Sequence, residues 1–225
     1  LPGDGLQSPV ISHNAQSFFI VGDPGFLGAS QGIRSTVVRD PANGRPLGPE
    51  LKIGVPILDG VYSPDDSIIA LAVAAPNRSR ETMFVDDGSA GTIQFWNWKT
   101  GERLGDPVSM PAEPRCVAWH PTRDLLAVIC GDGVVLTIDI QSRETQTLLH
   151  EQTPRVLGMP APGQYSSGGV SFSVDGSLLF EFGIRNEARA VDLRTGKVCY
   201  TMKRAYSGTQ ADSTDRFLVY SATQQ

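Results

Sequence analysis

The sequence predicts an all-β protein, a β-propeller built from four-stranded antiparallel blades with almost no helix. Three observations support this fold class. The 225 residues include 24 glycines and 16 prolines, which suits many short strands and turns. Two short motifs recur in order along the chain, at spacings close to those of propeller blades. No segment shows a long apolar periodicity of 3.6 residues.

The first recurring motif is a polar turn followed by an apolar strand. Its clearest copies start at Ser63, His120 and Ser173, and weaker copies start at His13 and Asp212. The spacings between these positions are 50, 57, 53 and 39 residues. The strands that follow the clear copies are Ile68–Val73, Leu125–Cys130 and Leu178–Phe182. Because these runs are continuously apolar, we expect them to be middle strands covered on both faces.

The second motif is an Asp or Asn at the end of a strand, followed by a tight turn. Its copies stand at Asp40, Asn97, Asp139 and Asp192, spaced by 57, 42 and 53 residues. In a propeller blade, strands a to d run outward from the central channel. The first motif then forms the a–b turn of each blade, and the second forms the c–d turn.

Together, the two motifs resemble the WD-repeat family. The family pattern runs from a Ser-Pro-Asp-Gly turn through an Asp-Gly turn to Trp-Asp and a Thr-Gly turn. This chain keeps Asp132-Gly133 and Trp96, although Asn97 replaces the following Asp. Residues 44–51, Gly-Arg-Pro-Leu-Gly-Pro-Glu-Leu, are similar to repeats appended to bacterial serine/threonine protein kinases. The resemblance implies a propeller that serves as a sensor or scaffold module of a larger bacterial signalling protein.

The chain departs from the family pattern at most of its Trp positions, where Arg39, Ile138 and Val191 stand instead. The hydrogen-bond network that the family builds inside each blade is therefore mostly absent. We expect these blades to depend more on apolar packing than on that network.

The motif positions divide the single propeller segment, residues 1–225, into successive blades. The expected blades are 8–53, 54–111, 112–151 and 168–204, with the a–b hairpin of a fifth in 205–225. Propellers close with about four to eight blades, and strands c and d of the fifth are missing. We therefore expect that the chain alone does not close a ring. Further blades, a ring shared in a dimer and closure by the N-terminal segment are open alternatives.

Composition argues against several classes of partner. The net charge of −5 and the isoelectric point near 5.2 disfavour nucleic acid, which requires clustered Lys and Arg. No apolar run approaches the length of a membrane span, and no signal peptide is visible. The cysteines Cys116, Cys130 and Cys199 are odd in number and widely spaced. They indicate free thiols and a cytoplasmic location.

No motif for catalysis, a cofactor or a metal stands out, and we expect a protein that is not an enzyme. His13 and His120 fall in different blades, so they do not converge on one ion. Trp96 and Trp98 should point to the same side of their strand and pack between blades. The alternative is a propeller enzyme, similar to a lactonase or hydrolase, with a metal in its channel. That site needs several acids on strands a, where Asp59 is the only one.

Insertion lengths point to one face as the binding surface. Between the two motif positions, the third and fourth blades use 19 residues each, whereas the first uses 27 and the second 34. Between the third and fourth blades, the d–a connection has about 11 extra residues compared with the others. All three insertions fall at the end opposite the a–b turns, where they could also simply cap the channel. Their Arg and aromatic residues favour a protein or peptide partner. The candidate contact residues are Phe26, Arg78, Arg80, Phe84, Arg155 and Tyr165.

Overall fold

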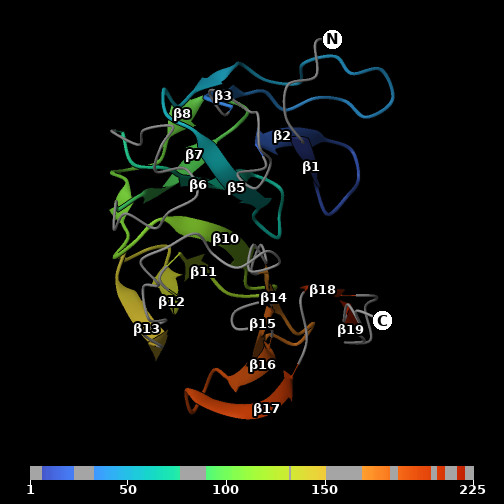
Figure 1. The fold of residues 1–225 in the computed structure, drawn as a ribbon. Coiled ribbons are helices and arrows are strands. Elements are labelled where there is room, and N and C mark those ends of the chain that lie inside the picture. Colours follow the sequence, from blue (N-terminus) through green and yellow to red (C-terminus); the bar gives the residue numbers. More distant parts are fainter. Residues whose placement is uncertain are drawn as a thin grey trace, which may run out of the picture. The chain divides into compact units, whose positions relative to one another are not determined.

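The computed structural model of the chain consists of β-strands joined by turns (Figure 1). It describes residues 7–22, 33–76, 90–131, 133–150, 169–182, 187–203, 207–210 and 217–220. Within these residues there is no helix, which confirms the all-β prediction. The chain divides into two compact units, residues 1–114 and 115–225.

The first unit begins with two short strand pairs. Strands β1 (Gln7–Ile11) and β2 (Phe18–Gly22) form one antiparallel pair, and β3 (Ser35–Thr36) and β4 (Leu51–Lys52) form another. Isolated bridges from Arg39 to Phe18 and to Pro46 connect the two pairs. We call this group the first sheet, because its segments follow one another in the order of a four-stranded meander.

The second sheet completes the first unit. Its strands β5 (Ile57–Tyr62), β6 (Ile68–Val73) and β7 (Thr92–Asn97) pair in antiparallel order. The short strands β8 (Glu102–Arg103) and β9 (Val108–Ser109) both pair with β7 on its outer side. One apolar cluster joins the two sheets, with Phe19 and Leu51 from the first and Tyr62, Leu71 and Trp98 from the second.

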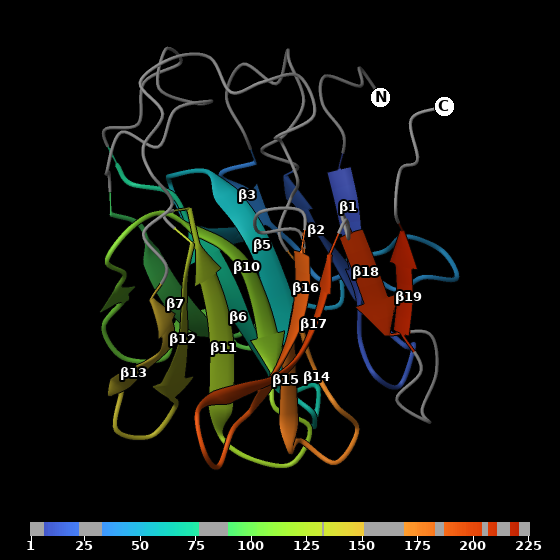
Figure 2. The same ribbon diagram turned by 60° about the horizontal axis from the view of Figure 1, so that its bottom comes forward.

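Two four-stranded antiparallel sheets form most of the second unit. The third sheet contains β10 (Pro114–Trp119), β11 (Leu125–Cys130), β12 (Val134–Asp139) and β13 (Thr145–His150), drawn side by side in green to yellow (Figure 2). The fourth contains β14 (Gly169–Phe172), β15 (Leu178–Phe182), β16 (Glu187–Asp192) and β17 (Lys197–Lys203). A final hairpin, β18 (Ser207–Gln210) and β19 (Phe217–Tyr220), follows them.

The predicted middle strands coincide with strands of the structure. The apolar runs expected to be strands b are β6, β11 and β15, with the same first and last residues. In β6 and β11, every residue after the first is buried. Successive side chains of a strand point to opposite faces, so both faces of these strands must be covered. The predicted packing of sheet against sheet is therefore correct within each unit.

The a–b turns repeat the same hydrogen bonds in three sheets. In each, a Ser hydroxyl contacts the Asp or Asn two residues later: Ser12 with Asn14 at 2.9 Å, Ser63 with Asp65 at 2.6 Å, and Ser173 with Asp175 at 2.7 Å. The first copy therefore begins at Ser12, one residue before the position at which the sequence pattern was aligned. His13 accordingly corresponds to Pro64 rather than to Ser63.

The c–d turns form a second repeated structure. In each, the Asp or Asn caps the turn: Asp40 accepts from the Ala42 N–H, Asn97 from Thr100, Asp139 from Ser142 and Asp192 from Thr195. A residue with positive φ follows every time, namely Gly44, Gly101, Arg143 and Gly196. Both predicted turn motifs are thus present. The closure of the sheets into a propeller stays a prediction.

Gly176 tests the packing between the a–b turns of the third and fourth sheets. Its φ is +73°, and a Cβ at this position would overlap the His120 ring. Gly196 has a similar φ of +67° but open space around it. We expect Gly196→Ala to lower the free energy of unfolding by about 1 kcal/mol, from backbone strain alone. Gly176→Ala should lower it by about 2 kcal/mol more, because the ring must move.

Urea denaturation of the two variants and the parent measures both effects. Equal losses in the two variants would show that the His120 ring moves aside at no cost.

Candidate functional site

The candidate contact residues of the sequence prediction lie outside the residues that the structure describes. These are Phe26, Arg78, Arg80, Phe84, Arg155 and Tyr165. The structure does fix where their segments connect. Segment 23–32 follows β2, segment 77–89 joins β6 to β7, and segment 151–168 joins β13 to β14. Their predicted role as contacts to a partner stays a prediction.

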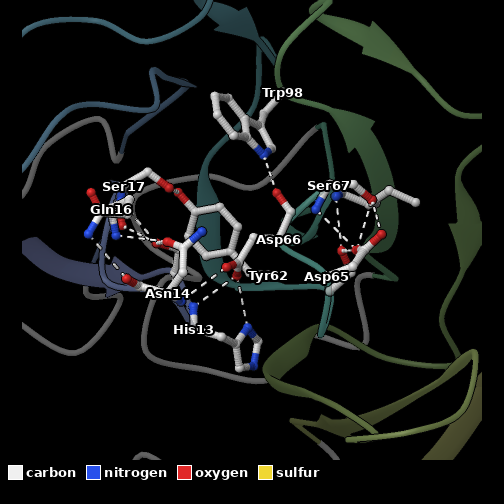
Figure 3. A network of polar contacts seen from close by, with 12 residues as sticks. His13, Asn14, Gln16, Ser17, Tyr62, Asp65, Asp66, Ser67 and Trp98 are labelled. Carbon is white, nitrogen blue, oxygen red and sulfur yellow. Dashed lines mark hydrogen bonds and ion pairs between the residues drawn. The ribbon is translucent and has the colours of Figure 1, made fainter.

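A polar network at the a–b turns of the first two sheets is centred on Asp66 (Figure 3). One carboxylate oxygen of Asp66 accepts from the His13 N–H at 2.8 Å, and the other accepts from the Asn14 N–H at 3.1 Å. The Nδ1 atom of His13 lies 2.9 Å from the first oxygen. The backbone carbonyl of Asp66 accepts from the Trp98 indole N–H at 2.8 Å. Asp66 therefore connects the turns of the first and second sheets.

Asp66 can play this part because of its place in the turn. It occupies the position that Gly176 holds in the fourth sheet, and its φ is +56°. Asp tolerates this left-handed conformation better than most residues. Burial alone would raise the pKa of Asp66, but the hydrogen bonds from His13 and Asn14 outweigh it and lower the pKa. The carboxylate is therefore ionised and fully engaged with the neighbouring turn.

Tyr62 forms a second contact between the same two sheets. Its side chain is 1% exposed, and its hydroxyl accepts a hydrogen bond from the Ser17 hydroxyl at 3.1 Å. Burial raises the pKa of Tyr62 to about 12, so the phenol is neutral at physiological pH. The ring also packs edge-on against Phe19, with ring centres 5.0 Å apart. Polar and apolar contacts thus hold the same pair of sheets together.

His13 and Asp66 have the geometry of a base and its orienting acid, which raises the question of catalysis. The His13 side chain is 55% exposed. Within the described residues, however, no hydrogen bond joins its other ring nitrogen to a hydroxyl or thiol. A nucleophile–base–acid arrangement needs that third contact. The pair acts as a clamp between two turns.

The second unit contains a corresponding contact, made by His120 and Gly176. The Nδ1 atom of His120 accepts from the backbone N–H groups of Thr122 and Arg123. The proton must then reside on Nε2, which donates to the Gly176 carbonyl at 3.1 Å. Burial lowers the pKa of His120, which keeps the ring neutral. In both units, a histidine of one a–b turn thus binds the left-handed residue of the next.

A buried ion pair lies inside the fourth sheet. Glu181 on β15 and Arg189 on β16 are register partners, and Arg189 Nε lies 2.7 Å from Glu181 Oε2. The two side chains are 0% and 5% exposed. Removing one partner of such a pair leaves a buried charge and costs several kcal/mol. A shift in the register of these two strands would separate the pair.

The part of the chain that the structure describes contains neither a candidate metal site nor a candidate membrane-spanning helix. No group of three or more His, Cys, Asp or Glu side chains gathers there in a way that could hold a metal ion. That part also includes no helix that is long and apolar enough to span a membrane. Asp59, the acid expected on strand a, lies in β5.

No protein-family model and no curated protein matches this sequence.

Asp66 is the residue of this network that the sequence patterns missed. The signal that could have found it is its place in the turn, where Asp66 stands at the Gly position of the Ser-Pro-Asp-Gly pattern. We expect Asp66→Gly to lower the free energy of unfolding by about 1–2 kcal/mol. The variant keeps the backbone shape but leaves the N–H groups of His13 and Asn14 without their acceptor. His13→Ala should cost less than about 1 kcal/mol, because that contact is exposed.

Chemical denaturation of both single variants and the double variant checks these values. An increase in stability for Asp66→Gly would mean that its backbone strain outweighs its contacts. The turn would then not depend on the carboxylate.

The turn aspartates should make stability fall in acid. Backbone and hydroxyl hydrogen bonds from Ser177 and Ser173 lower the pKa of Asp175 to about 2. A folded-state pKa below the unfolded one adds stability at neutral pH, and this stability is lost as the pH falls from about 4 to about 2. Asp175→Asn should weaken this acid dependence while keeping an acceptor for the turn. Asn14 already accepts equivalent bonds in the first sheet.

Unfolding free energies measured between pH 2 and pH 7 test this expectation. An unchanged acid profile in Asp175→Asn would exclude this carboxylate as a cause.

Proposed function

We propose that this chain is a protein- or peptide-binding module without catalytic activity. In this proposal its sheets are blades of a WD-type β-propeller that belongs to a larger bacterial signalling protein. Its partner contacts the segments 23–32, 77–89 and 151–168. The observation that carries the proposal is the difference between the two ends of the strands within each unit.

At one end, the a–b and c–d turns that the structure describes are short and closed by their own hydrogen bonds. The a–b turns at Ser12, Ser63 and Ser173 use their polar side chains to bind their own backbone. At the other end, the connections from β2 to β3, from β6 to β7 and from β13 to β14 contain 12, 18 and 18 residues. Because hairpin connections normally use two to five residues, these segments are longer than the sheets require. Long connections on a rigid scaffold are where binding residues gather.

The residue types in these segments suit a protein surface. Phe26, Phe84 and Tyr165 supply aromatic anchors, and Arg78, Arg80 and Arg155 supply charge and planar hydrogen bonding. The net charge of −5 makes a nucleic acid a poor partner for the chain as a whole. A peptide or protein with mixed apolar and acidic contacts fits this set better.

The proposal predicts that binding depends on the long segments. A partner recovered with the full chain should bind Phe84→Ala and Arg155→Ala less tightly, and the two changes together should weaken binding about tenfold or more. The free energy of unfolding should remain nearly unchanged. Calorimetric or surface-based titration with each purified variant measures the effect.

Gln16→Ala and Lys197→Ala are the matched controls, because both residues are exposed and lie at the short-turn end of their sheets. Their affinity for the partner should equal that of the parent chain. A partner that is sensitive to the controls and not to Phe84 and Arg155 would place binding at the other end.

A further inference from the structure

His120, in the a–b turn of the third sheet, is the buried one of the chain's three histidines. It is 2% exposed, whereas the side chain of His13 is 55% exposed and His150 is exposed. Phe172 of the fourth sheet packs against the His120 ring, with ring centres 5.0 Å apart. A Cβ on Gly176 would overlap the same ring. The His120 ring therefore fills the contact between the a–b turns of the third and fourth sheets.

The hydrogen bonds of His120 accommodate only the neutral ring. Its Nδ1 accepts from the N–H of Thr122 at 3.2 Å and from the N–H of Arg123 at 3.1 Å, and its Nε2 donates to the Gly176 carbonyl at 3.1 Å. A charged imidazolium is a donor at both nitrogens. A proton on Nδ1 would point at two N–H groups, and both of these groups would lose their acceptor. The ring and its turn cannot keep this arrangement once the ring is charged.

The surroundings of the ring also disfavour its charged form. Burial, the largest effect, and the nearby charge of Arg123 lower the pKa of His120. The Gly176 carbonyl and the carboxylate of Asp175, which face the ring from the fourth sheet, raise it by less. Asp175 is itself held by the serines of its own turn. The pKa of His120 therefore lies below its ordinary value, in agreement with the hydrogen bonds.

The contact between His13 and Asp66 in the first unit responds to acid in the opposite way. The Nδ1 atom of His13 lies 2.9 Å from a carboxylate oxygen of Asp66. A carboxylate accepts a hydrogen bond from a neutral or a charged imidazole, and the bond to the charged ring is the stronger. A proton added to His13 therefore preserves this contact, whereas a proton added to His120 breaks its own.

We propose that His120 is an acid-sensitive latch between the a–b turns of the third and fourth sheets. A proton from the solvent binds to Nδ1, and the N–H groups of Thr122 and Arg123 turn to water. The charged ring then leaves its place against Phe172 and Gly176. The turns of the second unit separate, while the clamp of the first unit stays closed. This latch does not involve the segments 23–32, 77–89 and 151–168, and it is independent of the proposed function.

The pH window of the latch follows from the direction of the pKa shift. A histidine whose pKa is lower in the folded than in the unfolded chain contributes stability that is complete above about pH 6.5. That stability is lost as the pH falls from there through the folded-state pKa. Uptake of one proton on opening changes the opening constant by at most about tenfold per pH unit. The window lies above the range from about 4 to about 2 in which the contribution of Asp175 is lost.

His120→Asn removes the titrating group but keeps an acceptor for the turn. An Asn oxygen can replace Nδ1, as the side-chain oxygen of Asn14 already accepts from the Gln16 N–H in the first sheet. In urea denaturation, the unfolding constant of the parent chain should rise about tenfold more between pH 7 and pH 5 than that of His120→Asn. His13→Asn is the matched control and should not reduce the rise. An equal rise in the parent and His120→Asn overturns the proposal.

Nuclear magnetic resonance of the unsubstituted chain is the second measurement, and it does not depend on the folding of a variant. The ring nitrogen shifts of His120 should report a proton on Nε2 alone at pH 7.5. On acidification, the ring and the amide protons of Thr122 and Arg123 should titrate with one midpoint, while the amide proton of Asn14 keeps its position. The proposal is overturned if the ring becomes charged without a change in the Thr122 and Arg123 amides. It is also overturned if the ring stays neutral down to the pH at which the whole chain unfolds.

Discussion

The middle strands of these sheets must have both faces covered, and the rest of the structure depends on that constraint. Strands such as β6 and β11 carry apolar side chains toward both faces. A sheet covered on only one face would leave about half of these side chains in water, at a cost of about 25 cal/mol for each Å² of apolar surface. Within each unit, successive sheets therefore pack face to face. The clusters around Tyr62 and around Leu179 are the result in the two units.

The turns set the geometry in which this packing occurs. The a–b turns at Ser12, Ser63 and Ser173 reverse the chain within about six residues, and the Ser and the Asp or Asn two residues later satisfy backbone groups that the reversal would leave bare. The same turns then contact the next sheet, through Asp66 in the first unit and Gly176 in the second. Two different groups, the Asp66 carboxylate and the Gly176 backbone carbonyl, accept the hydrogen bond from a histidine of the preceding turn. What the two turns share is an acceptor on a left-handed residue, supplied by the side chain of Asp66 and by the backbone of Gly176.

The sequence predicted the strands and turns well, because their signals are local. Apolar runs, interrupted in β15 by Glu181, marked β6, β11 and β15 to the residue, and Asp or Asn followed by a turn residue marked the c–d turns. The alignment of His13 with Ser63 was wrong by one residue. The hydroxyl that the turn needs belongs to the adjacent Ser12, but this weak first copy of the motif offered no other residue by which to align it.

Contacts between sheets were harder to predict than contacts within a turn. Asp66 bonds His13 across 53 positions of the sequence, and Tyr62 bonds Ser17 across 45. No local pattern encodes such pairs, since they depend on how far one sheet is shifted along the next. The ion pair of Glu181 and Arg189 is nearer in sequence but was also missed, because charged residues in a strand are usually read as exposed.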